Sequence, residues 1–188
     1  MILPTGQRYT HTAVGLHWLI ALLIFGLFPV GLYMVGLPLS PQKLKLYAWH
    51  KWTGITIFLL AVLRILWRAR HAAPAPPQTT PAWQHALASA IHLLLYVLVL
   101  AIPLSGWVMS SALGVPVVYF GVLQLPDLVG RNKELGEALK WLHSFLNYAM
   151  AALVAVHAAA ALKHHLVDRD DVLVRMIPFL DDPAERGR

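Results

Sequence analysis

Cysteine is absent from the 188 residues of this chain. Its absence excludes disulfides, iron–sulfur clusters, cysteine-ligated zinc and covalently attached c-type haem. Charge is also scarce, since Asp, Glu, Lys and Arg make up 13% of the sequence, about half of their share in soluble domains. Apolar residues make up 58%. This composition argues against an ordinary soluble enzyme and a disordered chain, and it makes a membrane a better partner than nucleic acid for a net charge of +6.

Long segments without charge predict four membrane-spanning helices. Three of them have apolar parts at residues 13–37, 83–111 and 141–163, each near or above the ~20 residues that cross a bilayer. The fourth, residues 46–67, contains Lys51 and Arg64 near its ends, where long side chains can reach the interface. Spanning segments in lipid must be helical. The sequence therefore predicts an all-α, integral-membrane four-helix bundle in one domain, residues 1–188.

Lys and Arg predict how the bundle is oriented, because they accumulate on the cytoplasmic side of membrane proteins. Nine lie near the N-terminus, in or beside the linker 68–81, or in the tail, and six lie in the other two loops. Both termini are therefore expected in the cytoplasm. The nine are Arg8, Arg64, Arg68, Arg70, Lys163, Arg169, Arg175, Arg186 and Arg188, and the six are Lys43, Lys45, Lys51, Arg131, Lys133 and Lys140.

Four of the ten histidines lie at two matched depths of the predicted spans. His17 is near the cytoplasmic start of the first span and His50 near the outer start of the second, while His143 and His157 are near opposite ends of the fourth. His143 and His157 are fourteen positions apart, which corresponds to ~21 Å of helical rise, with both side chains within about 40° of one face. Two such residues cannot share a metal ion, but each can give one axial ligand to one of two stacked haems. Depth then pairs His50 with His143 and His17 with His157.

Other interpretations of these histidines stay open. A single intramembrane His is often a hydrogen-bonded packing residue, and a set of them would fit a non-redox helical scaffold. A di-zinc site is a poorer alternative, because the spans contain no carboxylate. Two His ligands leave haem iron without an open position, so the haem interpretation predicts electron transfer rather than O2 activation. Gly54, one turn after His50, leaves room for a porphyrin or for close helix packing.

Two further histidines are candidates for a second role. His92, in the third span near the depth of the inner pair, is a candidate for binding a haem propionate, for lining a quinone pocket, or for replacing an inner ligand. His164 lies two turns beyond His157 at the cytoplasmic surface. It is a candidate for contacting quinone or protons, with a solvated helix end as the simpler interpretation.

Several motifs together resemble the bacterial cytochrome b561 family over about residues 7–178. They are R-Y-T-x-x-A-x-x-L-H-W from Arg8, W-H-K-W-T-G from Trp49 with R-I-L-W-R from Arg64, H-L-L-L-Y from His92 with P-L-S-G from Pro103, W-L-H-S from Trp141, and H-A-A-A-A-L-K-H-H from His157 with L-V-R-M-I-P from Leu173. The resemblance implies a bacterial inner-membrane four-helix bundle that binds two haems b. It also implies His17, His50, His143 and His157 as axial ligands. Well-understood members resemble superoxide oxidase, which passes electrons from superoxide to ubiquinone, whereas related cytochrome b subunits serve hydrogenases or formate dehydrogenases.

The first outer loop favours the superoxide interpretation. Residues 38–51 carry Lys43, Lys45 and Lys51 and no acid, although cations are disfavoured on the outer side. A cationic surface above the outer haem would steer a small anion and raise its on-rate by up to 10–10³-fold at low salt, with Lys45 and Lys51 as the candidate steering residues. Simple solvation of a short loop is the competing explanation. The predicted function is superoxide:ubiquinone oxidoreduction, and the alternative is a subunit relaying electrons between quinone and a partner dehydrogenase or hydrogenase.

Overall fold

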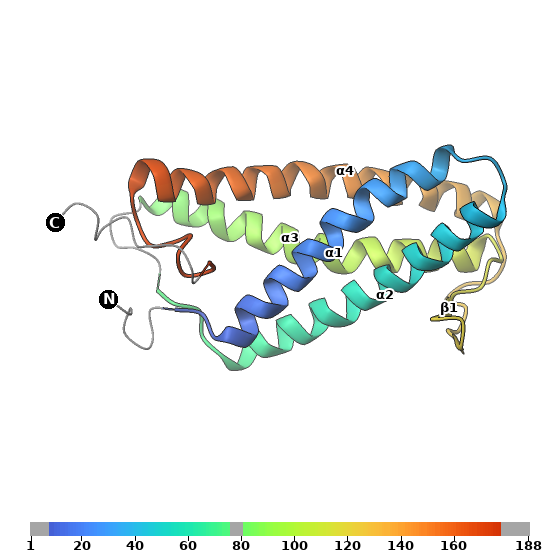
Figure 1. The fold of residues 1–188 in the computed structure, drawn as a ribbon, viewed down its shortest axis with the longest axis horizontal. Helices are drawn as coiled ribbons and strands as arrows, with labels where there is room; N and C mark the ends of the chain where they lie inside the picture. The colour runs from blue at the N-terminus through green and yellow to red at the C-terminus, as the bar shows by residue number, and fades with distance from the viewer. Residues whose placement is uncertain (1–7, 76–80, 178–188) are drawn as a thin grey trace.

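Four long helices dominate the computed structural model, which describes residues 8–75 and 81–177 (Figure 1). They are α1 (His11–Gly36), α2 (Pro41–Arg70), α3 (Ala82–Ala112) and α4 (Lys133–Lys163), and α4 continues into a π-helical turn, η1 (His164–Asp168). All four are long and apolar enough to cross a membrane. The predicted all-α bundle of four spanning helices is confirmed.

Polar side chains set where three of the helices begin. The Thr10 hydroxyl accepts a hydrogen bond from the Ala13 amide at 3.2 Å, the Ser40 hydroxyl from the Lys43 amide at 3.2 Å, and the Asn132 side-chain oxygen from the Leu135 amide at 3.0 Å. Such caps satisfy amides that have no partner within the helix. Three of the four helices are thus preceded by a local start signal, whereas α3 follows Pro81 without a side-chain cap.

Helix α4 is longer than the apolar run that predicts the fourth span. The run starts at residue 141, but α4 begins eight residues earlier, at Lys133. The added turns, KELGEALK, are amphipathic and carry Glu134 in the first turn, where a negative charge interacts favourably with the helix dipole. Hydropathy therefore marked the part of α4 that lies in lipid, and the helix extends beyond it.

The helices form an antiparallel bundle in which α1 packs against α2, α2 against α3, and α3 against α4. The start of α1 and the end of α4 lie at one end, here called the terminal end, and the α1–α2 connection lies at the other, here called the loop end (Figure 1). Buried apolar side chains fill the middle, while large apolar side chains such as Phe25, Leu63 and Leu94 are exposed. An apolar exterior of this kind is suited to lipid. The core residues are Ile20, Ile57, Ala61, Leu98, Val99 and Met150.

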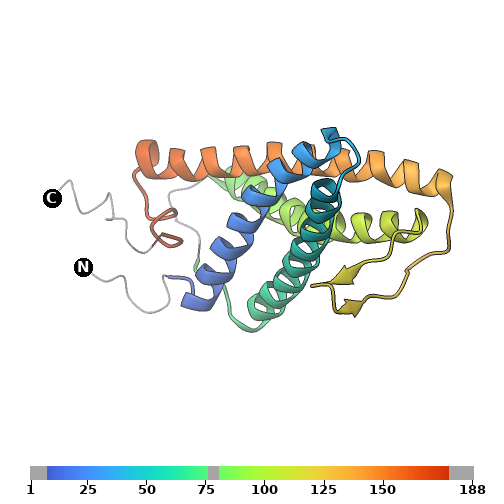
Figure 2. The same ribbon diagram turned by 45° about the vertical axis from the view of Figure 1, so that its right-hand side comes forward.

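Two smaller elements pack onto the bundle (Figure 2). At the loop end, β1 (Val118–Tyr119) and β2 (Leu123–Gln124) form an antiparallel hairpin with Tyr119 opposite Leu123. At the terminal end, residues 169–177 fold back toward α1, where the Trp18 indole donates to the Met176 carbonyl at 2.7 Å. Val174 of this segment is 1% exposed, so the segment is part of the packed structure.

Candidate cofactor site: two histidine pairs

The structure brings the four predicted histidines together as two pairs at opposite ends of the bundle. At the loop end, His50 of α2 faces His143 of α4, with ring centroids 6.3 Å apart and ring planes at 75°. At the terminal end, His17 of α1 faces His157 of α4, with centroids 6.3 Å apart and planes at 73°. These are the loop-end pair and the terminal-end pair.

The ring separation in both pairs suits one metal ion held between two imidazoles. A His nitrogen binds a metal at about 2 Å, so two nitrogens on opposite sides of one ion place their ring centroids about 6 Å apart. The observed 6.3 Å in each pair matches this spacing. Direct packing of the rings, or a hydrogen bond between them, would allow other ring separations and gives no reason for the two pairs to have the same one. The donor set therefore fits an axially ligated haem iron at each end.

Two glycines make space for the rings of the loop-end pair. A Cβ atom at Gly31 of α1 would lie 3.2 Å from His50 Cε1, and a Cβ atom at Gly106 of α3 would lie 3.2 Å from His143 Cε1. Both distances are tighter than ordinary carbon contacts, so a side chain at either position would require the ring to shift by a few tenths of an ångström. Gly54, for which the sequence suggested room for a porphyrin or close helix packing, has no neighbouring atom within 4 Å of a built Cβ. It therefore faces open space one turn from His50.

The two rings of the loop-end pair differ in their hydrogen bonds. His143 Nδ1 lies 3.1 Å from the Ile102 carbonyl and 2.9 Å from the Ser105 hydroxyl, and the hydroxyl donates to the same carbonyl at 2.7 Å. An Nδ1–H that donates in this way fixes the ring and leaves Nε2 as the free ligand atom. His50 Nδ1 is buried and has no hydrogen-bond partner among the described residues.

A third histidine and an arginine surround the terminal-end pair. The His92 ring of α3 lies 5.2 Å from the His157 ring, so His92 is close enough to touch a group bound there. Arg64 of α2 donates to the Ala13 carbonyl, one turn before His17 on α1. This bond holds a cationic group between α1 and α2 at the depth of the pair, where it can interact with an anionic substituent.

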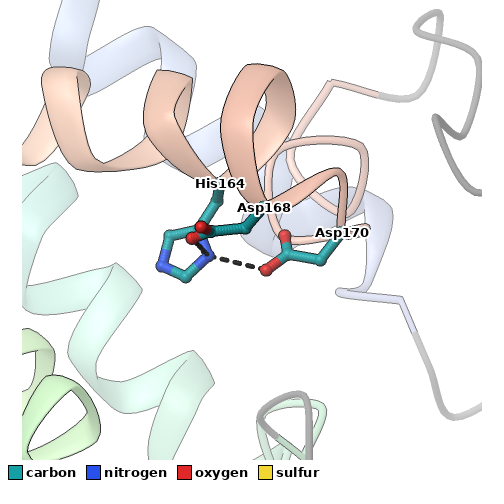
Figure 3. A group of neighbouring side chains, drawn as sticks. All are labelled: His164, Asp168 and Asp170. Atoms are coloured by element: carbon teal, nitrogen blue, oxygen red, sulfur yellow. Dashed lines mark hydrogen bonds and ion pairs between the residues drawn. The ribbon is translucent and has the colours of Figure 1, made fainter. Parts of the chain in front are cut away.

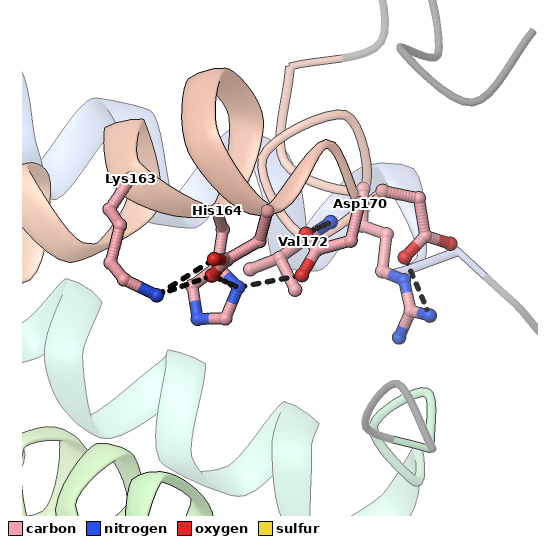
Figure 4. Close-up of polar contacts among 7 residues, drawn as sticks. Lys163, His164, Asp170 and Val172 are labelled. Atoms are coloured by element: carbon pink, nitrogen blue, oxygen red, sulfur yellow. Dashed lines mark hydrogen bonds and ion pairs between the residues drawn. The ribbon is translucent and has the colours of Figure 1, made fainter. Parts of the chain in front are cut away.

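His164 has its polar partners within its own segment (Figure 3). Its Nδ1 lies 2.6 Å from Asp170 and 3.3 Å from Asp168. These three residues can in principle hold a metal ion, but the Lys163 ammonium already occupies both oxygens of Asp168, at 2.8 and 2.6 Å (Figure 4). Asp170 also accepts from the Val172 amide at 3.0 Å. The group is best described as an ion-pair network that holds residues 169–177 in place.

Replacing Asp170 with alanine is expected to loosen this terminal segment. The substitution removes the partner of a half-buried His and the acceptor of the Val172 amide, a loss of about 1–3 kcal/mol. Trypsin should then cleave after Arg175 several-fold faster than in the wild type, measured by mass spectrometry. Glu137→Ala is the control, because its ion pair with Lys140 is exposed and contributes little. Equal cleavage in both variants would contradict the proposed role of the network.

The three lysines of the loop end each have a defined contact. Lys43 Nζ donates to the Leu37 carbonyl at 2.6 Å, and Lys51 Nζ lies 3.3 Å from the carbonyls of Val115 and Pro116. Lys45 Nζ lies 4.8 Å from the centre of the Trp49 ring. Within the described parts of the chain no carboxylate pairs with any of them. Their positive charge is therefore not neutralised at this surface.

Ser105, Gly31 and Gly106 are site residues that the sequence did not single out. Their relation to the histidines depends on how α1 packs on α2 and α3 on α4, over separations of 19 residues for Gly31–His50 and 38 for Ser105–His143. For Ser105 and Gly106, the available signal was that they form a Ser-Gly dipeptide inside an apolar helix. Glycine in a helix interior lowers helix stability, so its presence there indicates a packing role.

Comparison with known proteins gives consistent matches over most of the chain. A family model described as prokaryotic cytochrome b561 matches residues 8–179. The protein named cytochrome b561 homolog 2 of Escherichia coli (strain K12) is 34% identical, with 92% of this chain and 93% of that protein covered. Cytochrome b561 homolog 1 of the same strain is 31% identical, with 92% and 98% covered. The "Probable superoxide oxidase CybB" of Yersinia pestis is 30% identical, with 92% and 97% covered.

Proposed function

This chain belongs to the prokaryotic cytochrome b561 family of haem-binding, electron-carrying membrane proteins, and from that membership we propose that it is a di-haem superoxide:ubiquinone oxidoreductase. Two superoxide anions each give up one electron and leave as O2. One ubiquinone takes up the two electrons and two protons and becomes ubiquinol. The two histidine pairs with the same 6.3 Å ring separation are the observation that carries this proposal.

We assign one haem b to each pair. His50 and His143 would hold the haem at the loop end, and His17 and His157 the haem at the terminal end. Haem b bound in this way supplies reversible one-electron transfer without an open iron position. The bond from His143 Nδ1 to the Ile102 carbonyl orients its ring, and Gly31 and Gly106 let both rings of the loop-end pair reach their positions. Arg64 is placed to balance a propionate at the terminal end.

We place the loop end at the outer face of the bacterial inner membrane. The excess of Lys and Arg on the side of the termini supports this orientation. Lys43, Lys45 and Lys51 then face the periplasm with no acidic partner among the residues that the structure describes, and their field attracts superoxide toward the loop-end pair. The relative named as a probable superoxide oxidase, 30% identical to this chain, supports the same donor.

The quinone is expected at the terminal end, where His92 and His164 are the candidate contacts. His92 lies against His157, and His164 ends the same helix, with Asp168 and Asp170 beside it. An imidazole paired with carboxylates can pass protons to a reduced quinone. A quinone bound at either histidine would receive electrons from the terminal-end pair and protons from the cytoplasmic side.

The proposal is tested on the purified, haem-loaded protein. We expect a b-type reduced-minus-oxidised spectrum with two haems per chain. Rapid mixing with superoxide is expected to reduce the haems and then a ubiquinone analogue, and superoxide dismutase should abolish both steps. Absence of haem would overturn the cytochrome assignment. Two haems with slow reduction by superoxide would instead favour an electron-relay subunit for a partner dehydrogenase or hydrogenase.

Gly31→Val is expected to weaken haem binding at the loop-end pair alone. A built Cβ at Gly31 already lies 3.2 Å from the His50 ring, and the extra methyl groups must displace that ring. Overpacking of this size costs about 1–3 kcal/mol, or roughly 5- to 150-fold in affinity. Gly26→Val is the matched control on α1, since nothing lies within 4 Å of a Cβ there. Equal haem content in both variants after dilution would show that Gly31 is not needed for the ring.

A further inference from the structure

The β1–β2 hairpin carries apolar side chains that the bundle does not cover. Phe120 is 60% exposed, Val122 89% and Leu123 59%. No charged residue occurs in residues 113–126. A loop in water would normally expose polar side chains, whereas an exposed apolar cluster marks a contact surface.

Contacts with α2 fix the depth of the hairpin. The Trp52 indole donates to the Val118 carbonyl, and the Tyr119 hydroxyl lies 2.9 Å from the Thr56 hydroxyl. Thr56 is six residues past His50 toward the middle of α2, ~9 Å further along the helix. Both ribbon views show the hairpin beside the bundle rather than beyond its end (Figures 1 and 2). The hairpin therefore reaches the depth of the loop-end pair or lies deeper.

The turn of the hairpin holds Phe120 in a backbone conformation that is unfavourable for a bulky residue. Phe120 has φ +50° and Gly121 has φ +74°, and the Val122 amide donates to the Tyr119 carbonyl at 3.1 Å. Positive φ at both central residues is the type I′ arrangement, which favours Asn and Gly. A bulky aromatic residue is uncommon there, yet Phe120 is held at the tip with most of its surface exposed.

We infer that the β1–β2 hairpin is inserted into the lipid of the membrane leaflet at the loop end. The Tyr119 hydroxyl contacts Thr56 of α2, and Leu59, three residues further along this helix, is 54% exposed. Pairing of β1 with β2, together with the Leu125 amide donating to the Val117 carbonyl at 2.8 Å, satisfies the backbone groups that face each other within the hairpin and so lowers the cost of placing it in lipid. The three exposed side chains form too small a surface for a stable protein interface, which buries about 1,000 Å² or more. Lipid is therefore the occupant that fits.

The absence of cysteine permits a direct test. Val122→Cys, Leu59→Cys and Asp127→Cys are each labelled with a nitroxide in the full, haem-loaded chain and reconstituted in phosphatidylglycerol–phosphatidylethanolamine vesicles. Collision of the label with dissolved O2 and with a water-soluble nickel chelate is measured by EPR power saturation. Leu59 provides the lipid-facing reference, and Asp127, exposed in the same loop, provides the aqueous one.

We expect the O2-to-nickel collision ratio at Val122 to match that at Leu59 and to exceed that at Asp127. A ratio equal to that at Asp127 would place the hairpin in water and overturn the inference. Poor access to both reagents would show that protein covers the tip, and this would overturn it as well. Haem spectra of the three labelled variants should match the wild type, which confirms that the fold is retained.

Discussion

Replacing His50 with alanine is expected to reduce the haem b content from two per chain to one. The substitution removes one of the two proposed ligand nitrogens at the loop-end pair. The centroid of the opposite ring, His143, is 6.3 Å away, and this ring cannot supply both ligands. His143→Ala should lose the same haem. His17→Ala and His157→Ala should lose the other, so a redox titration should show the same missing component within each pair.

His92 provides the control for this experiment. Its ring lies 5.2 Å from His157, closer than the spacing in either pair, and His92→Ala is expected to keep both haems. The pairing is wrong if His92→Ala loses the terminal-end component while His17→Ala keeps it. Haem content by pyridine haemochrome and the two midpoint potentials provide the measurements. Loss of both haems in every variant would mean that the bundle needs all four ligands to fold, and folding would then be checked by circular dichroism.

Reversing the charge at Lys45 is expected to slow haem reduction by superoxide several-fold at low salt. Lys45 contacts the Trp49 ring next to His50, and in the described residues it has no acidic partner whose loss would confuse the result. A cationic field raises the on-rate of a small anion by up to 10–10³-fold. The difference between Lys45→Glu and the wild type should shrink above 0.1 M salt, where exposed charges more than about 10 Å apart are largely screened.

Variants at Lys51 and Lys140 separate the effect of the local charge at Lys45 from effects of lost contacts and of net charge. Lys51→Gln removes charge but also the contacts with the Val115 and Pro116 carbonyls, so part of its effect is expected to persist at high salt. Lys140→Glu changes the net charge by the same amount at the same end, but Lys140 lies on α4 beside Glu137. A similar loss in Lys140→Glu and Lys45→Glu would indicate net charge alone, and unchanged rates in all three variants would exclude steering.

The sequence was informative about features that depend on a single helix and on whether its residues lie in lipid or in water. Charge-free runs located three of the four helices because lipid excludes charge over most of a span, and the fourth was located by an apolar run with Lys51 and Arg64 near its ends. The helical period placed His143 and His157 on one face of α4, and depth alone selected their partners His50 and His17, which the structure brings close. Each of these inferences uses geometry within a single helix or the thickness of the membrane.

Features that depend on how helices pack could not be predicted in the same way. Gly31 and Gly106 matter because of rings on other helices. Nothing local distinguishes Gly31 from Gly26, and the Ser105–Gly106 dipeptide indicates a packing role without identifying the ring that it accommodates. The hairpin before α4 has no clear sequence signal, because its strands have two residues each and Phe120 at positive φ does not follow the usual turn preferences. The folding of residues 169–177 onto Trp18 depends on a backbone carbonyl, which carries no sequence signal.

The position of the two pairs along α4 has an energetic consequence for the living membrane. The ~21 Å of rise between His143 and His157 is roughly two thirds of a 30 Å hydrocarbon core. In the proposed orientation an electron that travels this interval moves toward the negative side of the transmembrane potential. Moving one electron across the full membrane costs about 2.3 kcal/mol per 100 mV of potential. Moving it across this interval therefore costs about 1.6 kcal/mol at 100 mV. Quinone reduction by this protein is therefore expected to slow in energised vesicles and to recover when an ionophore collapses the potential.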